Sequence, residues 1–170
     1  MIKISVKKLT SNNFKKFGDV ISAKNTKNSM LINSGWTKRF NKLSNYNSLE
    51  KKPSKPIISI FRGYRRPFPI EIKMLECHPL ASQAFVPLYG GDWLIVACSG
   101  NEKKPDISKI KCFIASQSQG INFFPGTWHH PLIIIDKVQD FLILDRDDGN
   151  DKVNKNLTVY NIKSKIVLNY

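Results

Sequence analysis

All three histidines of this 170-residue chain lie in two short motifs. In the first motif Glu76 and His78 are two positions apart, and in the second His129 and His130 are adjacent. Histidine moves protons near neutral pH and is a common metal ligand. Alternate side chains of a strand share a face, so Glu76 and His78 should point the same way. Only one of the adjacent pair can point inward, and we expect this to be His129. The spacing predicts Glu76, His78 and His129 as catalytic residues.

The same three residues are also a candidate metal site. Two imidazoles and one carboxylate suit Fe, Ni or Mn, and a divalent ion held by Glu76, His78 and His129 could act as a Lewis acid. The spacing resembles the motifs of the cupin barrel, in which Glu76, His78 and Gln83 would occupy positions of the first motif. The second cupin motif ends in Pro-x-Gly-x-x-His, and residues 125–129 match its latter half. Acid/base catalysis without a metal is the alternative.

Short apolar runs separated by Pro and Gly predict an all-β fold, a cupin-like antiparallel β-barrel or sandwich with few short helices. The expected strands are residues 2–6, 19–22, 38–41, 57–62, 71–77, 83–87, 93–97, 121–124, 132–136 and 141–145, with two more within 157–168. A capped short helix is expected from Ser11, and a second at 105–110. Tyr89-Gly90-Gly91-Asp92 predicts a hairpin that joins the strands on either side of it.

The net charge of +14 is unevenly distributed. Residues 1–55 hold 13 Lys and Arg against 2 Asp and Glu, a net of +11, whereas residues 56–150 hold 10 of each. Both histidine motifs therefore lie in an electrically neutral segment. Only 5 of the 27 basic residues are Arg, and no arginine stripe or stacking motif accompanies the charge, so we expect no nucleic-acid partner. A nucleic-acid-binding barrel driven by the basic first segment is the alternative.

The length fits one domain with a substantial core. We expect a cupin-like domain at residues 1–150 and a basic C-terminal extension at 151–170, which adds one or two edge strands packed on the barrel or on a partner subunit. No apolar run approaches the roughly 20 residues of a membrane span, and the N-terminus lacks the apolar middle of a signal peptide. The three cysteines follow no pattern, and we expect them to be reduced. These features predict a cytoplasmic protein without membrane contact.

Arginine is scarce, so each arginine that could anchor an anion stands out. Arg62 ends the apolar run 57–61, and a guanidinium there suits bidentate capture of a carboxylate. A surface salt bridge at a strand end is the alternative interpretation. Arg39 and Arg146 are further candidates of the same kind. We therefore predict Arg62, Arg39 and Arg146 as substrate-binding residues.

Several motifs together resemble the ureidoglycolate lyase family, formerly called ureidoglycolate hydrolase. The resemblance covers residues 1–148 in order, and its most specific blocks are 78–87 and 128–132. The blocks that carry it are Phe14-Lys15-Lys16-Phe17-Gly18-Asp19-Val20-Ile21, Ile32-Asn33-Ser34-Gly35, Arg39-Phe40, Ile58-Ser59-Ile60-Phe61-Arg62, Leu75-Glu76, His78-Pro79-Leu80, Gln83-Ala84-Phe85-Val86-Pro87, Gly120-Ile121-Asn122, Trp128-His129-His130-Pro131-Leu132, and Asp140-Phe141-Leu142 with Asp145-Arg146.

The resemblance implies a cupin-like barrel, usually a homodimer, that cleaves (S)-ureidoglycolate to glyoxylate and urea in allantoin and purine degradation. It also implies nickel as the possible metal. The residue types suit this elimination, which needs a base for the hydroxyl proton, an acid for the leaving nitrogen and an anchor for the carboxylate. Gln83 and Asn33 can contact the urea group through their amides, and Ser59 is a further predicted substrate-binding residue.

Two departures from the family pattern leave the substrate open. Asp147-Asp148 stand where we expect a pair of glycines, and Phe123-Phe124-Pro125 stand where we expect aromatic and basic residues. One alternative is therefore a cupin enzyme that acts on another small hydroxy acid. A second alternative is a non-catalytic barrel that binds a small acid without turnover.

Overall fold

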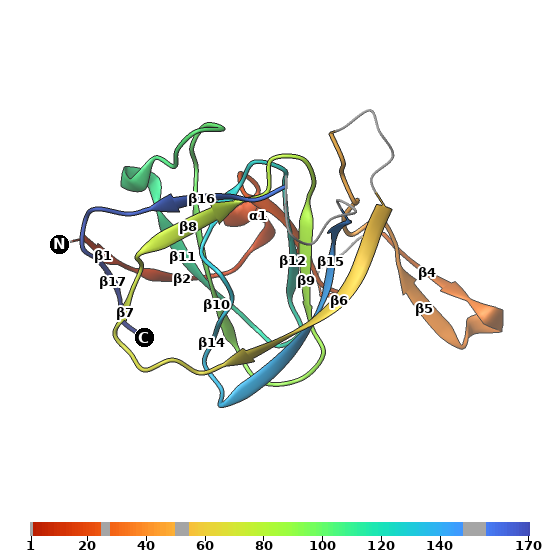
Figure 1. Cartoon of the computed structure of the whole chain (residues 1–170). Helices are drawn as coiled ribbons and strands as arrows, with labels where there is room; N and C mark the ends of the chain where they lie inside the picture. Colours follow the sequence, from red (N-terminus) through yellow and green to blue (C-terminus); the bar gives the residue numbers. More distant parts are fainter. Residues whose placement is uncertain (1, 25–27, 50–54, 148–155) are drawn as a thin grey trace.

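The computed structural model describes residues 2–24, 28–49, 55–147 and 156–170. Within these residues the chain is mostly strands, and its helical segments are short (Figure 1). The prediction of an all-β fold is confirmed, and the arrangement is consistent with a cupin-like sandwich. Among the described residues, no helix is both long and apolar enough to span a membrane.

One layer of the sandwich is a seven-stranded sheet, called here the large sheet. Its strands lie in the order β16 (Thr158–Asn161), β8 (Met74–Cys77), β13 (Trp128–His129), β10 (Trp93–Cys98), β11 (Lys111–Ala115) and β2 (Val6–Lys8), and β14 (Ile133–Ile134) also pairs with β10. All six residues of β10 are buried. Its alternate side chains contribute to two separate core clusters, one on each face of the sheet. The large sheet is therefore covered on both faces.

The second layer is a five-stranded sheet. Its strands lie in the order β3 (Gly18–Ile21), β12 (Gly120–Phe123), β9 (Gln83–Pro87), β15 (Val138–Asp147) and β6 (Lys55–Tyr64). Phe85, Phe123, Phe141 and Ile143 of this sheet pack in the first core cluster, against β10 and β11 of the large sheet. The edge strand β6 is ten residues long and leaves several apolar side chains exposed: Ile57, Ile58, Ile60, Phe61 and Tyr64.

A three-stranded sheet, in the order β1 (Ile2–Ile4), β17 (Ile166–Leu168) and β7 (Ile70–Glu71), contributes to the second core cluster. β1 and β17 pair in parallel, so the first and last strands lie side by side (Figure 1). Of the C-terminal extension, β16 lies at the edge of the large sheet and β17 lies in the middle of this small one. Residues 151–155 lie outside the described part.

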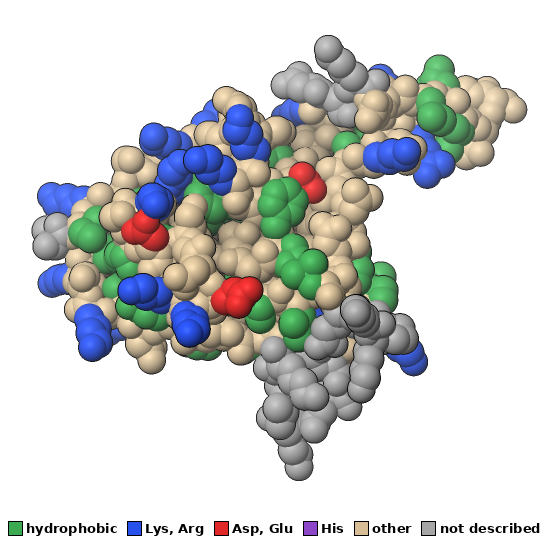
Figure 2. All heavy atoms as spheres, turned by 90° about the horizontal axis from the view of Figure 1, so that it is seen from above, with side chains coloured by type: hydrophobic (Ala, Val, Ile, Leu, Met, Phe, Trp, Pro, Cys, Tyr) green, Lys and Arg blue, Asp and Glu red, His purple; other side chains and the backbone are tan. Residues whose placement is uncertain are grey.

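β4 (Ser29–Ile32) and β5 (Thr37–Phe40) form a hairpin, called here the arm, that projects from the sandwich (Figure 1). The 3-10 turn η1 (Asn33–Gly35) joins the two strands. Met30, Leu31 and Trp36 of the arm are exposed. Figure 2 shows hydrophobic and basic side chains together on the arm, whereas Lys and Arg side chains are scattered over the rest of this face.

The expected hairpin at residues 89–92 is wrong. β9 pairs with β12 and β15, and β10 pairs with strands of the large sheet. The segment between them therefore carries the chain from one layer to the other. Gly90 has a positive φ of 98°, as the sequence suggests, but this φ serves the crossover. Two consecutive buried strands look alike in sequence whether they pair or face each other across a core.

The two expected helices are short. The first is α1 (Ser11–Phe14), which begins with a capping box between Thr10 and Asn13. The segment at 105–110 forms only the 3-10 turn η2 (Ile107–Lys109).

Candidate active site

The large sheet brings Glu76, His78 and His129, called here the triad, to one place. β8 and β13 are neighbours, and their register places His129 opposite Glu76. Opposed side chains of neighbouring strands share a face. His129 Nε2 lies 3.5 Å from Glu76 Oε1, and the imidazole rings of His78 and His129 are 5.4 Å apart. One ligand atom from each of the three residues lies within 4.8 Å of the others. The two sequence motifs therefore converge as expected.

Backbone carbonyls set the tautomer of both imidazoles. His78 Nδ1 lies 2.7 Å from the carbonyl oxygen of Asn156, and His129 Nδ1 lies 2.9 Å from that of Thr127. Because a carbonyl oxygen only accepts, each Nδ1 donates, and each neutral ring keeps a lone pair on Nε2. Both Nε2 atoms are buried and make no hydrogen bond to another described residue. Two imidazole lone pairs are thus available beside one carboxylate.

The turn before β13 holds the second motif against the first. Gly126, at φ 82°, donates its N–H to the His78 carbonyl oxygen at 2.9 Å. The Thr127 hydroxyl donates to the carbonyl oxygen of Phe17 at 2.9 Å. The Phe123 ring stacks on the His129 imidazole, with centroids 4.1 Å apart and planes 15° from parallel. His129 is therefore held at Nδ1 and at one ring face, and Nε2 is the atom left for chemistry.

Electrostatics keep a neutral imidazole beside an ionised carboxyl. Burial lowers the pKa of His78 and the neighbouring His129 lowers it further, against the opposing effects of Asp145 and Glu76. Burial raises the pKa of Glu76, but the His129 imidazole 3.5 Å away outweighs it, so the pKa lies below its usual range. Burial also lowers the pKa of His130 to about 4. Neutral imidazole and ionised Glu76 suit proton abstraction followed by proton return.

Gln83 and Asp145 lie on the five-stranded sheet next to the triad. Gln83 is opposite Phe123 in the β9–β12 register, and the Phe123 ring covers His129. Gln83 Nε2 donates to Asp145 Oδ2 at 2.8 Å, and Asp145 Oδ1 accepts the Arg146 N–H at 2.7 Å. Gln83 is only 3% exposed, and its Oε1 is buried without a hydrogen-bond partner among the described residues. The structure thus places the predicted Gln83 close to the triad.

Arg62 is not brought to the triad. Its side chain is 58% exposed, and it forms a bidentate ion pair with Asp140 in which both N–O distances are 2.8 Å. The β6–β15 register places Arg62 opposite Asp140, and Ile57 opposite Asp145. Arg62 is therefore five residues, or about 17 Å, along the strand from the Asp145 position. The geometry favours the ion-pair interpretation, and capture of a substrate carboxylate by Arg62 stays a prediction.

Asn33 and Arg39 lie in the arm, also apart from the triad of their own chain. Asn33 Nδ2 donates to Thr37 Oγ1 at 3.2 Å, within the hairpin. Arg39 is opposite Met30 in the arm and is exposed. Asn33 and Arg39 therefore do not reach a substrate bound at the triad of the same chain.

Arg146 and Ser59 lie nearer to the Asp145 end of the five-stranded sheet. Arg146 follows Asp145 on β15, so its side chain points to the other face, where Nη1 donates to Ser48 Oγ at 3.2 Å. Ser59 is half-buried and opposite Ile143, whose side chain lies in the core. The roles of both residues toward substrate stay predictions.

Sequence reasoning missed Asn156 and Asp145. Asn156 is 2% exposed and accepts the His78 hydrogen bond at its carbonyl oxygen. Its Oδ1 also accepts the N–H groups of Leu80 and Ala81, at 2.7 and 3.2 Å. A lone Asn in a polar, lysine-rich stretch carries no signal of this role. Asp145 did carry a signal, since it is an acid that directly follows the apolar run Ile143-Leu144.

The cysteines are not candidate nucleophiles. Cys77, Cys98 and Cys112 are free and buried. Burial raises the pKa of Cys77 to about 11, and the pKa values of Cys98 and Cys112 to about 12. Because the thiolate is the reactive form, these protonated thiols leave catalysis to the imidazole and carboxyl groups.

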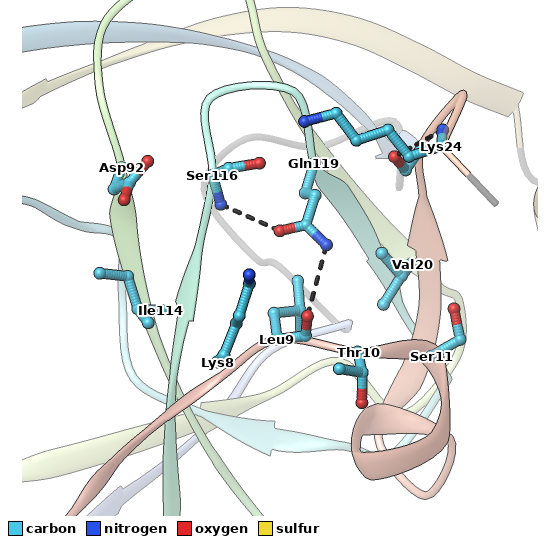
Figure 3. Close-up of a pocket in the computed structure, with 11 residues that line it drawn as sticks. Lys8, Leu9, Thr10, Ser11, Val20, Lys24, Asp92, Ile114, Ser116 and Gln119 are labelled. Carbon is cyan, nitrogen blue, oxygen red and sulfur yellow. Dashed lines mark hydrogen bonds between the residues drawn. The ribbon is translucent and has the colours of Figure 1, made fainter.

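A cavity of about 600 Å³ near α1 contains none of the triad residues. Figure 3 shows Gln119 within it, with both ends of its amide already bonded. Gln119 Nε2 donates to the Leu9 carbonyl oxygen at 3.4 Å, and Oε1 accepts the Ser116 N–H at 3.0 Å. Among the described residues that line this cavity, Asp92 is the single acid and none is a histidine. The described lining thus lacks the imidazole–carboxylate arrangement found at the triad.

Comparison with known proteins gives a consistent assignment. The sequence profile of the ureidoglycolate lyase family matches residues 1–169, and so includes the C-terminal extension. A ureidoglycolate lyase of Burkholderia mallei (strain NCTC 10229) is 40% identical over 158 residues, which cover 92% of this chain and 91% of that protein. A ureidoglycolate lyase of Pseudomonas syringae pv. syringae (strain B728a) is 42% identical over 152 residues, covering 89% and 88%. The chain therefore belongs to the ureidoglycolate lyase family.

Proposed function

We propose that the protein is a lyase that cleaves (S)-ureidoglycolate to glyoxylate and urea, in the degradation of allantoin. The observation that carries this proposal is the pair of buried Nε2 atoms of His78 and His129 beside the Glu76 carboxyl group. The names of the family and of its relatives support the substrate. The elimination needs no nucleophile, which agrees with the protonated state of the cysteines.

One proton changes place in this reaction. The carbinol hydroxyl loses its proton, the carbon–oxygen bond becomes the glyoxylate carbonyl, the carbon–nitrogen bond breaks, and the leaving nitrogen takes up a proton to give urea. His129 can make both transfers, because Nδ1 is occupied by the Thr127 carbonyl oxygen and Nε2 can accept the hydroxyl proton and return it to nitrogen. Glu76, 3.5 Å from Nε2, stabilises the imidazolium in between, and His78 is the partner of His129.

A divalent metal is the second arrangement that the triad supports. The two free Nε2 lone pairs and the Glu76 carboxylate are a fitting donor set for Fe, Ni or Mn, and nickel is the ion that the family resemblance implies. When bound, the ion would supply Lewis-acid polarisation of the substrate hydroxyl or carboxylate. Since one lone pair of His129 Nε2 cannot hold an ion and a proton together, metal binding at His129 and proton transfer by His129 are alternatives.

A direct assay tests the proposed function. Purified protein incubated with ureidoglycolate should release glyoxylate and urea in equal amounts. Related hydroxy acids assayed in parallel test the alternative substrate. Release of neither product, with tight binding of ureidoglycolate, would overturn the proposal in favour of a non-catalytic barrel.

We also propose a homodimer. The arm is a two-stranded hairpin, a structure that is marginally stable alone in water, and its Leu31 and Trp36 are 67% and 92% exposed. The β6 edge exposes Ile58 and Ile60 as well. Contiguous apolar patches of this kind mark interaction surfaces, and a second copy offers the same two patches. Light scattering should give about twice the 19.4 kDa chain mass. Leu31→Ser with Trp36→Ser should shift the protein toward the monomer; a monomeric wild type contradicts the proposal.

We place the enzyme in the cytoplasm, without a nucleic-acid or membrane partner. Three buried free thiols suit a reducing compartment. Cell fractionation tests the location, and retention on heparin in moderate salt would contradict the expectation about nucleic acid.

A further inference from the structure

Gln83, which is buried, and Asp145, which is half-buried, form a pair at the triad end of the five-stranded sheet. The β9–β15 register opposes Ala84 with Leu144 and Phe85 with Ile143, which brings Gln83 and Asp145 next to each other. The side chains of Phe85 and Ile143 lie in the core between the two layers. Two-residue alternation then places Gln83 and Asp145 on the same inner face.

The hydrogen bond between the two side chains determines which way the Gln83 amide points. Asp145 Oδ2 is 2.8 Å from Gln83 Nε2, and an ionised carboxylate only accepts hydrogen bonds. The amide nitrogen must therefore face Asp145, and the amide oxygen must face away from it. That oxygen is buried and has no hydrogen-bond partner among the described residues. A buried acceptor left in this state is available to a bound molecule.

The free oxygen of Gln83 lies in the same region as the free nitrogens of the triad. Gln83 is opposite Phe123, whose ring lies on His129. Asp145 is close enough to His78 to act on its charge. Three buried polar atoms at one end of the sandwich, Gln83 Oε1, His78 Nε2 and His129 Nε2, thus lack a hydrogen-bond partner among the described residues. The nitrogens suit the reacting hydroxyl group, and the oxygen suits a donor.

We propose that Asp145 is a positioning residue, which locks the Gln83 carboxamide so that Oε1 accepts a hydrogen bond from the N–H groups of the substrate's ureido end. This inference rests on the proposed function and specifies how the site selects a ureido acid over a simple hydroxy acid. A ureido group offers N–H donors, whereas a hydroxy acid without nitrogen has none to place at this oxygen. A site built around a buried acceptor discriminates against ligands that leave that acceptor unpaired.

Two inhibitors separate the two ends of the substrate. Ureidoacetate keeps the ureido group and the carboxylate but lacks the hydroxyl group, and glycolate keeps the hydroxyl group and the carboxylate but lacks the ureido group. In Asp145→Asn the orientation of the Gln83 carboxamide is no longer fixed, because an asparagine amide can pair with either end of the Gln83 amide. We expect the dissociation constant of ureidoacetate to rise about tenfold, the effect of one hydrogen bond. Glycolate should bind at least as tightly as to the wild type, since a negative charge has been removed.

A double variant and a matched control complete the experiment. In Gln83→Glu with Asp145→Asn, the asparagine amide can donate to the glutamate, which again presents an acceptor oxygen. This variant should restore ureidoacetate binding to within about threefold of wild type. Asp140→Asn makes the same charge change on the same strand, and should leave both dissociation constants unchanged. Calorimetry gives these constants without turnover, and thermal unfolding checks that each variant is folded.

The outcomes are distinct. Equal weakening of ureidoacetate and glycolate, or no weakening of either, overturns the role of Asp145. So does a double variant that binds ureidoacetate as weakly as Asp145→Asn does. A wild-type protein that binds ureidoacetate in this selective way but releases no glyoxylate from ureidoglycolate would overturn the proposed reaction and leave the assignment of Asp145 intact.

Discussion

The two ends of β15 hold similar chemical groups in opposite settings. Asp140, near one end, accepts two hydrogen bonds from Arg62, whose side chain is 58% exposed. Asp145, near the other end, accepts a hydrogen bond from Gln83, which is 3% exposed. Asp140 and Asp145 are five positions apart, so their side chains point to opposite faces of the sheet. Asp140 is itself only 7% exposed, but its partner Arg62 extends into solvent, whereas Asp145 points toward the large sheet and the triad.

This contrast shows that the role of a side chain on the five-stranded sheet depends on whether it points toward solvent or toward the large sheet. The ion pair of Arg62 and Asp140 satisfies both partners, and solvent screens what remains of their charge. The amide of Gln83 meets a carboxylate at its nitrogen end, and its oxygen end is buried with no hydrogen-bond partner among the described residues. Arg62 attracts attention in the sequence because arginine is scarce, but scarcity says nothing about the face on which a side chain lies.

The largest effect on activity should come from removing the His129 imidazole of the triad, which lies beside the Asp145 end of β15. His129→Ala should lower kcat by roughly 10²–10⁴-fold, the usual contribution of one acid/base group. Initial rates of glyoxylate release measure this loss. His130→Gln is the matched control at the next position, since His130 donates from Nδ1 to the Pro131 carbonyl oxygen and is not one of the triad. Normal turnover by His129→Ala would refute the site assignment.

The second prediction concerns pH and the stability of the buried end. Burial lowers the pKa of His130 to about 4, below the ordinary value of about 6.5. Between pH 4 and pH 6.5, His130 is therefore mostly protonated in the unfolded chain and mostly neutral in the folded chain. His130 should therefore destabilise the fold progressively as pH falls from 6.5 to 4, by up to about 3 kcal/mol. Urea unfolding at a series of pH values measures this slope, which His130→Gln should reduce. An identical slope in that variant contradicts the prediction.

The third prediction asks whether the triad binds a metal. A divalent ion such as Ni²⁺ at about 100 times its dissociation constant should stabilise the chelator-treated wild type by about 2.7 kcal/mol. His78→Ala should lose this stabilisation, whereas Arg62→Ala should keep it, because Arg62 lies at the exposed end. Thermal unfolding with and without the ion measures the difference. Full activity and unchanged unfolding after chelator treatment would favour proton transfer by His129 without a metal.

The smallest effect on activity should come from changing Arg62, whose side chain is exposed. From the sequence alone, Arg62→Lys should mainly raise KM, because the bidentate fork is lost while the charge stays. The ion pair with Asp140 leads us to expect instead that KM and kcat stay within about twofold of wild type. Steady-state kinetics distinguish the two outcomes. A large rise in KM would mean that Arg62 reaches substrate in another way, for example in the site of a partner subunit.

The triad could be predicted from the sequence because the signals within each motif are local and the spacing of the two motifs resembles that of the cupin barrel. Two-residue alternation relates Glu76 to His78, and the turn around Gly126 precedes His129, so each motif carries its own geometry. The crossover at residues 88–92 could not be predicted, because glycines look the same in a hairpin and in a link between layers. The C-terminal extension could be predicted as strands but not as part of the site, since the contact of Asn156 with His78 joins positions 78 residues apart.

The pairing of the first strand with the last one also affects when the enzyme can become active. β1 lies beside β17, and Asn156 sets the tautomer of His78. Until the ribosome has added Asn156 and β17, the nascent chain already contains both histidine motifs but can neither pair β1 nor align His78. Pairings between distant positions also form slowly. Activity should therefore appear only after Asn156 and β17 have been synthesised and have packed, and an N-terminal fragment that ends before Asn156 should carry the triad and yet remain inactive.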